Sequence, residues 1–224
     1  MMCETTALCK KFGTILLPLL LLVGCQQLLN APTPNARFEP LDLSESVGVS
    51  VIDLIGDVPT VASPEQTELV LWAMQDWARV LDGRLRFHMV KNERDALVRV
   101  RFVPSRTDHY GEMFPFNANG KRGANIYVRG DADKLGRVLE RRARRDDLFL
   151  ATVVYATVLH ELGHALGLGH SMNSQDIMYA MVMGGDVEQY LLQFRHKLSK
   201  RTDLANKSVL SFGDRANLRA LYAK

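Results

Sequence analysis

Hydrophobic and polar residues follow distinct periods along the chain, and the first clear patterns lie in its first half. The stretch Val47–Leu54 is rich in β-branched and apolar residues, which predicts a strand. Ser63 as N-cap, Pro64 at the first helical position and Gln66 three residues after the cap predict a helix start. The helix that follows, up to Gly83, carries one apolar stripe formed by Leu69, Val70, Ala73, Trp77, Val80 and Leu81.

Polar and apolar residues alternate at period two after this helix. The alternation predicts two half-buried strands, at Arg84–Val90 and Ala96–Val103. Residues 104–123 are rich in Gly, Pro, Asn and Asp, so we expect a long loop there. A further short strand is predicted at Ala124–Val128.

Helical patterns dominate the second half of the chain. Arg141–Arg145 reads "RRARR", for which a solvated helix face beside Asp146 and Asp147 is favoured over a binding patch. From Leu148 the residues become apolar up to His160, which predicts a buried helix. Residues 186–200 predict another helix, with an apolar side formed by Val187, Tyr190, Leu191, Phe194 and Leu198.

Composition sets limits on size and on partners. The chain has 224 residues, of which 47% are hydrophobic and 24% charged, so one globular domain is the default. The net charge is only +3, and the region after the first thirty residues has no continuous basic face. A nucleic-acid partner therefore has little support.

The first thirty residues predict an export signal instead of a folded segment. A basic start is followed by the apolar run Phe12–Val23, which is shorter than the roughly 20 residues needed to cross a bilayer. The run ends in "LVGC", which resembles the lipobox of bacterial lipoproteins, with cleavage between Gly24 and Cys25 and lipidation of Cys25. Gln26 follows, and by resemblance to the enterobacterial sorting pattern the absence of Asp there favours the outer membrane.

Cysteine usage agrees with this prediction. Cys3 and Cys9 leave with the signal, so Cys25 stands alone and cannot form a disulfide within one mature chain. The proline-containing stretch that follows predicts a flexible tether. We therefore expect a signal peptide at residues 1–24, a lipidated N-terminus and tether at 25–46, and a catalytic domain at 47–224.

The stretch "HELGHALGLGH" holds the candidate chemistry. His160 and His164 are four residues apart and so point from one face of a helix, where two imidazoles can share one ion. Gly167 can end that helix with a positive φ, which lets His170 return as a third ligand. Three histidine ligands with an open fourth position predict a catalytic zinc site, with Glu161 as general base for a water.

These residues resemble a known group. "HELGHALGLGHS" followed by "DIMY" is similar to the metzincin metalloproteases, the matrixin branch in particular. In that family a methionine lies in a turn beneath the zinc histidines; Met178 matches it, and Met172 ranks second. The ending of the chain, "LSFGDRANLRALYAK", is similar to the last helix of a matrixin catalytic domain.

The resemblance implies an α+β fold of the metzincin (zincin) type. It implies a twisted mixed sheet with a backing helix, an active-site helix, and a small C-terminal subdomain with a terminal helix. It also implies peptide binding along a sheet edge, for which "GANIYV" is the candidate strand. The histidines of a second, structural zinc are missing apart from His109, whereas Asp131 and Asp133 are possible calcium ligands.

The sequence thus predicts an exported, lipid-anchored zinc endopeptidase. Its expected partners are a peptide or protein substrate and a membrane, and we expect a monomer. The alternative is a zinc-containing lipoprotein that binds peptides or glycans without cutting them. A cell-wall peptide as substrate is also open. Glu161 favours catalysis, because a purely binding site has no need of a base beside the metal.

Overall fold

A computed structural model describes residues 38–55, 58–103, 109–131, 136–180 and 186–223. The predicted signal peptide, Cys25 and the first part of the predicted tether lie outside the described residues, as does Asp133.

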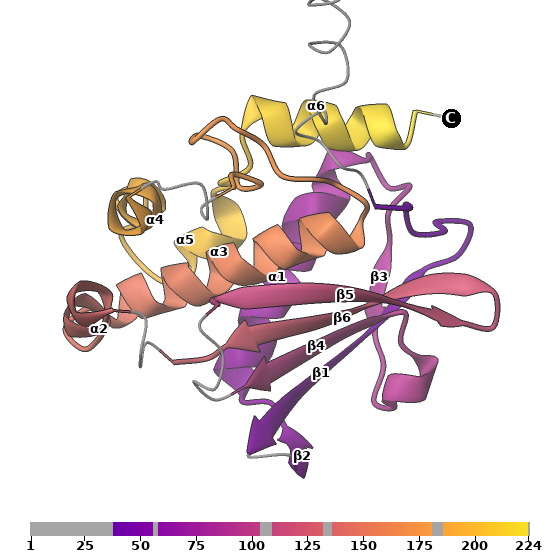
Figure 1. The fold of residues 1–224 in the computed structure, drawn as a ribbon, viewed down its shortest axis with the longest axis horizontal. Helices are drawn as coiled ribbons and strands as arrows, with labels where there is room; N and C mark the ends of the chain where they lie inside the picture. The colour runs from indigo at the N-terminus through magenta and orange to yellow at the C-terminus, as the bar shows by residue number, and fades with distance from the viewer. Residues whose placement is uncertain (1–37, 56–57, 104–108, 132–135, 181–185, 224) are drawn as a thin grey trace, which may run out of the picture. The chain divides into compact units, whose positions relative to one another are not determined.

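A mixed β-sheet forms the centre of the fold (Figure 1). Its strands run in the order β2-β1-β4-β6-β5, and β3 pairs with the start of β1. β1, β4 and β6 are parallel to one another, whereas β2 and β5 at the two ends are antiparallel to their neighbours. The strands are β1 (Val47–Ile55), β2 (Val58–Val61), β3 (Phe87–Met89), β4 (Val98–Val103), β5 (Gly111–Ala118) and β6 (Lys121–Arg129).

The helices account for most of the second half of the chain. They are α1 (Pro64–Val80), α2 (Arg137–Ala143), α3 (Asp147–Ala165), α4 (Val187–Arg195), α5 (Asp203–Asn206) and α6 (Phe212–Leu221), with a short 3₁₀ turn at Glu93–Asp95. Ser63 forms the predicted capping box with Gln66, which fixes the start of α1. The predicted helix at 186–200 is present but ends at Arg195. The expected α+β fold with a mixed sheet, a backing helix and a terminal helix is confirmed.

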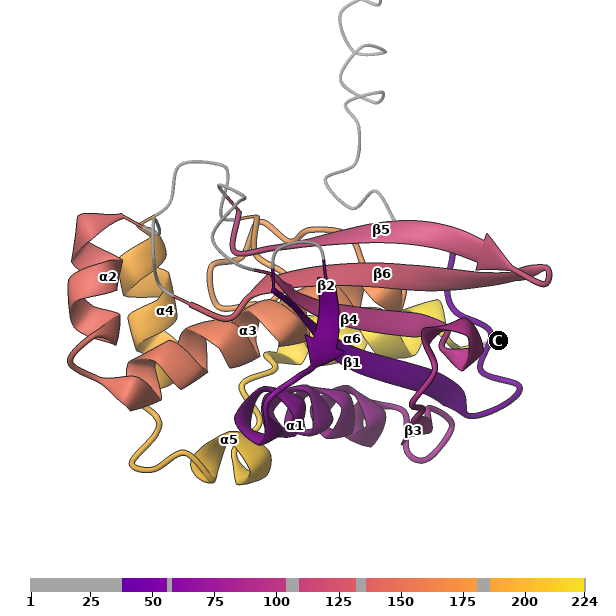
Figure 2. The same cartoon turned by 90° about the horizontal axis from the view of Figure 1, so that it is seen from below.

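Apolar side chains of the parallel strands and of the two long helices share one core. Val100, Phe102 and Ile126 from the strands are fully buried with Trp77 of α1 and Leu159 of α3. The indole N–H of Trp77 donates to the carbonyl of Leu159 at 2.8 Å, so α1 is bonded to the backbone of α3 just before His160. In Figures 1 and 2, α3 runs alongside the sheet and α2 and α4 lie side by side at its N-terminal end.

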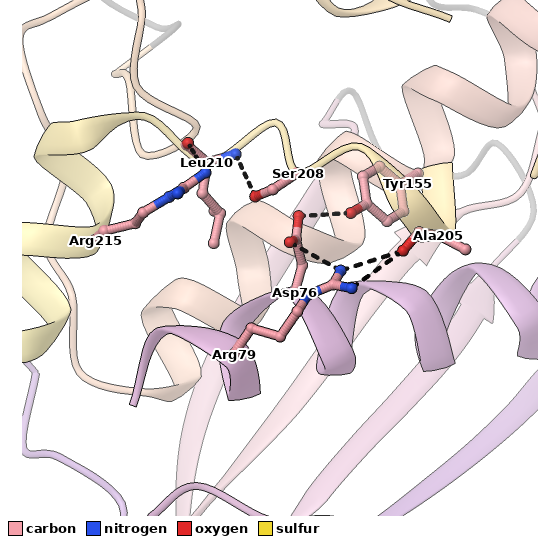
Figure 3. Close-up of polar contacts among 7 residues, drawn as sticks. All are labelled: Asp76, Arg79, Tyr155, Ala205, Ser208, Leu210 and Arg215. Atoms are coloured by element: carbon pink, nitrogen blue, oxygen red, sulfur yellow. Dashed lines mark hydrogen bonds and ion pairs between the residues drawn. The ribbon is translucent and has the colours of Figure 1, made fainter. Parts of the chain in front are cut away.

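A buried carboxylate joins three helices (Figure 3). The Tyr155 hydroxyl on α3 donates to Asp76 on α1 at 2.9 Å, and Arg79 donates to the other oxygen of Asp76 at 3.1 Å. Arg79 also donates to the carbonyl of Ala205 in α5. Asp76 is only 1% exposed, and an unpaired carboxylate so deeply buried would destabilise the fold. The hydrogen bonds from Tyr155 and Arg79 compensate for the lost contact with water.

The prediction of a long loop at 104–123 is wrong, because Gly111–Ala118 forms β5, the last strand of the sheet. Pro115 is compatible with a strand here because β5 has a neighbour on one side only. Asn119 and Gly120, both at positive φ, form the tight turn that joins β5 to β6. The Asn-Gly pair is a hairpin-turn signal that the sequence itself contains.

The prediction that "GANIYV" is an edge strand is also wrong. These residues lie in β6, which pairs with β4 on one side and β5 on the other. Both sides of β6 are therefore occupied by backbone hydrogen bonds. The strand on the other side of β6 is β5, which ends the sheet and has one unpaired side; β2 ends the sheet at its opposite edge.

The folded part begins earlier than the predicted boundary at Val47. Leu41 is 3% exposed, and its N–H donates to the Tyr222 hydroxyl at 3.1 Å. Lys121, the first residue of β6, forms ion pairs with Asp42 and Glu45. Residues we expected in the tether are thus held against the domain by one buried leucine and a few polar contacts.

Helix α3 is the one helix of the described residues that is long and apolar enough to cross a membrane. However, 89% of its most apolar stretch is buried within the fold. It is therefore the core helix that the sequence predicted.

Candidate metal centre

Helix α3 carries the first two histidines of the candidate site. Asp146 caps its start by accepting from the N–H of Phe149 at 3.0 Å. The helix ends after Ala165, and Gly167 at φ +104° turns the chain away, as the sequence predicted. His160 and His164 therefore lie one turn apart near its end, each 7% exposed.

His170 joins these two histidines from the segment beyond Gly167. The ring centroids of the three imidazoles are 4.6 to 5.3 Å apart, and one ligand nitrogen from each lies within 4.8 Å of the others. The Nε2 atoms of His164 and His170 face each other at 3.1 Å. In the parts of the chain that the structure describes, this is the one cluster of three or more potential metal ligands.

Backbone carbonyls orient the two buried rings. Nδ1 of His160 lies 2.6 Å from the carbonyl oxygen of Ile177, and Nδ1 of His164 lies 2.9 Å from that of Leu168. A carbonyl only accepts, so each Nδ1 carries the proton and donates. Each Nε2 therefore keeps a free lone pair, as is usual for metal-binding histidines.

The protonation states of the histidines also suit a metal. Burial lowers the pKa of His160 to about 3, assisted by His164, and burial lowers the pKa of His164 to about 4. The pKa of His170 is lowered by burial as well. All three rings are thus neutral at pH 7, and a set of three neutral imidazoles fits zinc.

Glu161 lies between the histidine cluster and the edge strand. It is 6% exposed, and burial, with a smaller effect of Glu112, raises its pKa to about 8. A β-carbon placed on Gly111 of β5 would lie 2.9 Å from Cγ of Glu161 and 3.0 Å from its Oε1. The start of β5 therefore passes directly over this carboxyl group.

Met178 packs directly beneath the active-site helix. It is 3% exposed, and its thioether lies so close to Gly163 that a β-carbon on that glycine would collide with the sulfur. Gly163 lies between His160 and His164 in sequence, so the methionine lies under the histidine pair. Met172, the second-ranked candidate, is 56% exposed.

Two residues that were not predicted from the sequence hold the Met178 segment. Asp214 of α6 accepts from the N–H groups of Ile177 at 2.8 Å and Met178 at 3.2 Å. The Tyr190 hydroxyl of α4 donates to the carbonyl of Ile177 at 3.0 Å, the same carbonyl that accepts from His160. Ser211 and Asp214 form a capping box, so an S-x-x-D signal at the start of the last helix was available for one of them.

Two further residues that the sequence analysis missed contact the end of α3. Arg122 of β6 is 8% exposed and donates to the carbonyl of Ala165 at 2.7 Å, which stabilises the C-terminus of the helix. The ring of Phe38 contacts that of His164 edge to face, with centroids 5.4 Å apart. Both contacts join residues far apart in sequence, so no local motif could indicate them.

The remaining predicted metal residues have other partners or lie outside the described parts. Nε2 of His109 lies 3.6 Å from Oε1 of Glu112. Asp131 accepts from Arg129 at 3.3 Å, and Asp133 is not among the described residues. Calcium binding stays a prediction.

The end of α3 presents two neutral imidazoles, and the segment beyond Gly167 adds a third. This convergence beside a mixed sheet defines a metal-binding protein of the zinc-site type. Comparison with known families is consistent with this class, since the Peptidase_M10 model, described as Matrixin, matches residues 52–195. The match covers more than half of the chain. The chain belongs to the matrixin family.

Several individual proteins are similar to parts of the chain. A putative matrix metalloproteinase of Trichoplusia ni ascovirus 2c is 36% identical over 120 residues, which cover 46% of this chain and 22% of that protein. Stromelysin-1 of Rattus norvegicus is 29% identical over 107 residues, which cover 48% of this chain and 21% of that protein. The chain thus spans about a fifth of the length of these relatives.

Among solved structures, that of myroilysin matches 84% of this chain and 96% of its own. Its sequence identity is 15% and its TM-score 0.40.

Proposed function

We propose that this chain is a zinc-dependent endopeptidase in which Glu161 acts as the general base. The observation that carries the proposal is the convergence of His160, His164 and His170 beside a buried carboxyl group at the edge of the sheet. Membership of the matrixin family supports it. When bound, zinc supplies the Lewis acidity that polarises a peptide carbonyl and acidifies water.

Each residue has a distinct role in this proposal. The three histidines hold the ion through Nε2, and the carbonyls of Ile177 and Leu168 keep two of the rings in place. Glu161 accepts a proton from the attacking water and donates it to the leaving amine. A pKa raised to about 8 by burial suits this role, because the carboxyl can take up a proton near neutral pH.

The free side of β5 is the proposed binding site for the substrate backbone. A peptide added there as a further strand would pass Gly111, next to Glu161. This assignment replaces "GANIYV", whose two sides are both occupied within the sheet.

Substitution of the base tests the mechanism. We expect Glu161→Gln in the full chain to retain zinc and to reduce the cleavage of a peptide library at least about a hundredfold. The partly exposed pair Glu68–Arg201, outside the histidine cluster, offers a control of the same chemical kind, because Glu68→Gln should leave turnover unchanged. Equal turnover of wild type and Glu161→Gln would contradict the mechanism, and zinc-loaded but inactive wild type would favour a binding protein.

We also propose export and lipid anchoring through Cys25, with the outer membrane as destination. The apolar run ending in "LVGC" supports this, since several acyl chains anchor a protein stably where one chain is marginal. Expression in a bacterial host with radiolabelled palmitate should label the wild type but not Cys25→Ser. Label on the variant would exclude Cys25 as the acceptor.

A further inference from the structure

A hollow of about 330 Å³ lies between α2 and α4, at the end of α3 remote from the histidines. Figures 1 and 2 both show α2 and α4 side by side at this end. We call it the α2–α4 hollow. Its lining consists of Val138, Arg141, Arg142, Arg145, Asp146 and Glu188.

The α2–α4 hollow carries an excess of positive charge. Its two carboxylates are each paired with an arginine, Glu188 with Arg142 at 2.9 Å and Asp146 with Arg195 at 2.9 Å. Arg141 and Arg145 are exposed, and neither side chain has an ion-pair partner among the residues that the structure describes. Two guanidinium groups are therefore available to a ligand. The exposure of both arginines agrees with the solvated helix face expected beside Asp146 and Asp147.

The α2–α4 hollow lies on the line of the proposed peptide strand. β5 starts beside Thr157 and Glu161 of α3, and the turn after β5 leads to Arg122, which contacts Ala165 at the end of α3. β5 and α3 thus run in the same direction. A peptide on the free side of β5 that continues past Gly111 therefore extends toward the start of α3 and toward Asp146.

The distance from Glu161 to the α2–α4 hollow determines which residue of a bound peptide can reach the hollow. Glu161 and Asp146 are separated by about four turns of α3, roughly 22 Å at a rise of ~1.5 Å per residue. An extended peptide covers this distance in about seven residues, at ~3.3 Å each.

We propose that the α2–α4 hollow binds an acidic side chain of a peptide substrate, about seven residues from the bond that is cut. The inference rests on the proposed function for its link to cleavage. Paired guanidinium groups are well suited to a carboxylate, which they can bind in a bidentate geometry. Val138, 57% exposed beside the arginines, offers an apolar contact for the stem of a glutamate.

A binding measurement tests the site without any need for catalysis. The full zinc-loaded chain is titrated with fluorescein-labelled hexaglutamate, and anisotropy is compared with that of a labelled Gln-Ser hexapeptide. We expect preferential binding of hexaglutamate that weakens with salt, and an about tenfold higher Kd for the double variant Arg141→Ala/Arg145→Ala. Lys91→Ala/Arg94→Ala removes two exposed charges elsewhere and should leave the Kd unchanged. Equal Kd values for the wild type and the Arg141/Arg145 double variant would overturn the site.

Cleavage kinetics test whether the α2–α4 hollow selects peptide substrates with an acidic residue. Two peptides share the best-cleaved library sequence, and one carries Glu-Glu and the other Gln-Gln seven residues from the scissile bond, with each side of the bond tested in turn. We expect an about tenfold preference for the acidic peptide in KM, with kcat unchanged, and loss of the preference in the Arg141/Arg145 double variant. A preference that survives in this variant, or no preference in the wild type, would overturn the proposal. If no peptide is cut at all, the proposed function fails while the hexaglutamate result still decides the site.

A membrane surface is the competing ligand for exposed arginines. Vesicles of phosphatidylcholine with phosphatidylglycerol are therefore tested by sedimentation with the same variants. If the Arg141/Arg145 double variant loses vesicle binding and keeps its affinity for hexaglutamate, the arginines serve a lipid surface and the proposal is wrong. If it loses hexaglutamate binding alone, the proposal stands.

Discussion

Gly111 and Gly163 each lie where a side chain would collide with a functional group. At Gly163 the space is filled by the thioether of Met178, and at Gly111 it is filled by Glu161 and Thr157. Neither glycine has a positive φ, so neither is needed for an unusual backbone conformation. Each is needed because neighbouring atoms occupy the space of a β-carbon. The missing β-carbons let the sheet edge and the methionine segment contact α3 directly.

Gly111→Ala should therefore lower the kcat of peptide hydrolysis strongly and the free energy of unfolding only slightly. The added methyl group would lie 2.5 Å from Cγ2 of Thr157 and 2.9 Å from Cγ of Glu161, so the general base must move. A displacement of this kind lowers kcat by about ten- to a hundredfold. Peptide hydrolysis and urea unfolding of the zinc-loaded variant measure the two effects.

A second substitution distinguishes the collision with Thr157, which lowers stability, from the displacement of Glu161, which lowers kcat. Thr157→Ser removes the colliding Cγ2 and keeps the hydroxyl that donates to the carbonyl of Val153. In Gly111→Ala/Thr157→Ser we expect stability to recover while kcat stays low. If kcat recovers together with stability, the position of Glu161 is not what limits turnover.

Short-range spacing explains why most candidate site residues could be predicted. His160, Glu161 and His164 share one helical turn, and His170 and Met178 follow at family spacing, so the pattern is visible in one stretch. Gly111 was hidden because its contact with Glu161 joins segments about fifty residues apart, which only the fold brings together.

At the scale of elements, α6 holds the segment that supports His160. Asp214 binds the N–H of Ile177, and the carbonyl of Ile177 accepts from Nδ1 of His160. The same carboxylate accepts from the N–H of Ser211 at its own helix start. One buried side chain thus links the last helix to the orientation of a metal ligand.

Asp214→Asn should weaken zinc binding as well as the fold. An amide in place of the carboxylate turns an NH₂ group toward backbone N–H donors, which leaves buried donors unpaired and costs about 1–3 kcal/mol. We expect an about tenfold loss of zinc affinity because the support of His160 is disturbed. Competition with a chromogenic zinc chelator measures the affinity, and urea unfolding measures the stability.

Asp203→Asn is the matched control. Asp203 in α5 is also buried and accepts from the backbone N–H of Ser199 at 2.8 Å, but it has no contact with the Met178 segment. Its substitution should lower stability and leave zinc affinity unchanged. Equal losses of zinc affinity in both variants would show that the effect is general destabilisation.

The wrong prediction of a loop at residues 104–123 shows that a local sequence pattern does not reveal which strands pair. Gly, Pro and Asn are rare in strands taken alone, yet β5 exists because eight residue pairs with β6 supply its hydrogen bonds. The helices needed no such partner information, since Ser63 and the apolar stripe of α1 are local signals. Tertiary pairing therefore decides the edge strand, and with it the proposed substrate-binding side.

On the scale of the whole molecule, both ends of the described fold meet behind the metal centre. The Tyr222 hydroxyl accepts from the N–H of Leu41 at 3.1 Å and donates to the carbonyl of Leu166 at 2.8 Å. The end of α3 is thus held by segments from the start and the end of the described chain. We expect metal binding at this helix end to be coupled to global stability.

The metal-free chain should accordingly be most stable near pH 6.5. Burial lowers the pKa values of His160 and His164 to about 3 and 4, so below pH 6.5 the unfolded chain binds more protons and acidification destabilises the fold. Burial raises the pKa of Glu161 to about 8, so between pH 4.5 and 8 the folded chain binds the extra proton and alkali destabilises it. The effect of the two histidines outweighs that of the glutamate below pH 6.5, and the effect of the glutamate outweighs theirs above it.

Urea unfolding of the chelator-treated chain at pH 5, 6.5 and 8 measures this maximum. The opposing effects leave a net difference of less than one proton over each interval, which corresponds to a loss of about 1 kcal/mol on either side, at ~1.4 kcal/mol per proton and pH unit. Glu161→Gln cannot titrate, so its stability should rise slightly from pH 6.5 to 8 as the unfolded histidines lose their last protons, while the acid loss grows. Added zinc should raise the stability of the wild type most at pH 8 and least at pH 5, because protonated imidazoles do not bind the ion. A metal-free chain equally stable at pH 5 and 6.5 would mean that the histidines are not the buried, neutral cluster described above.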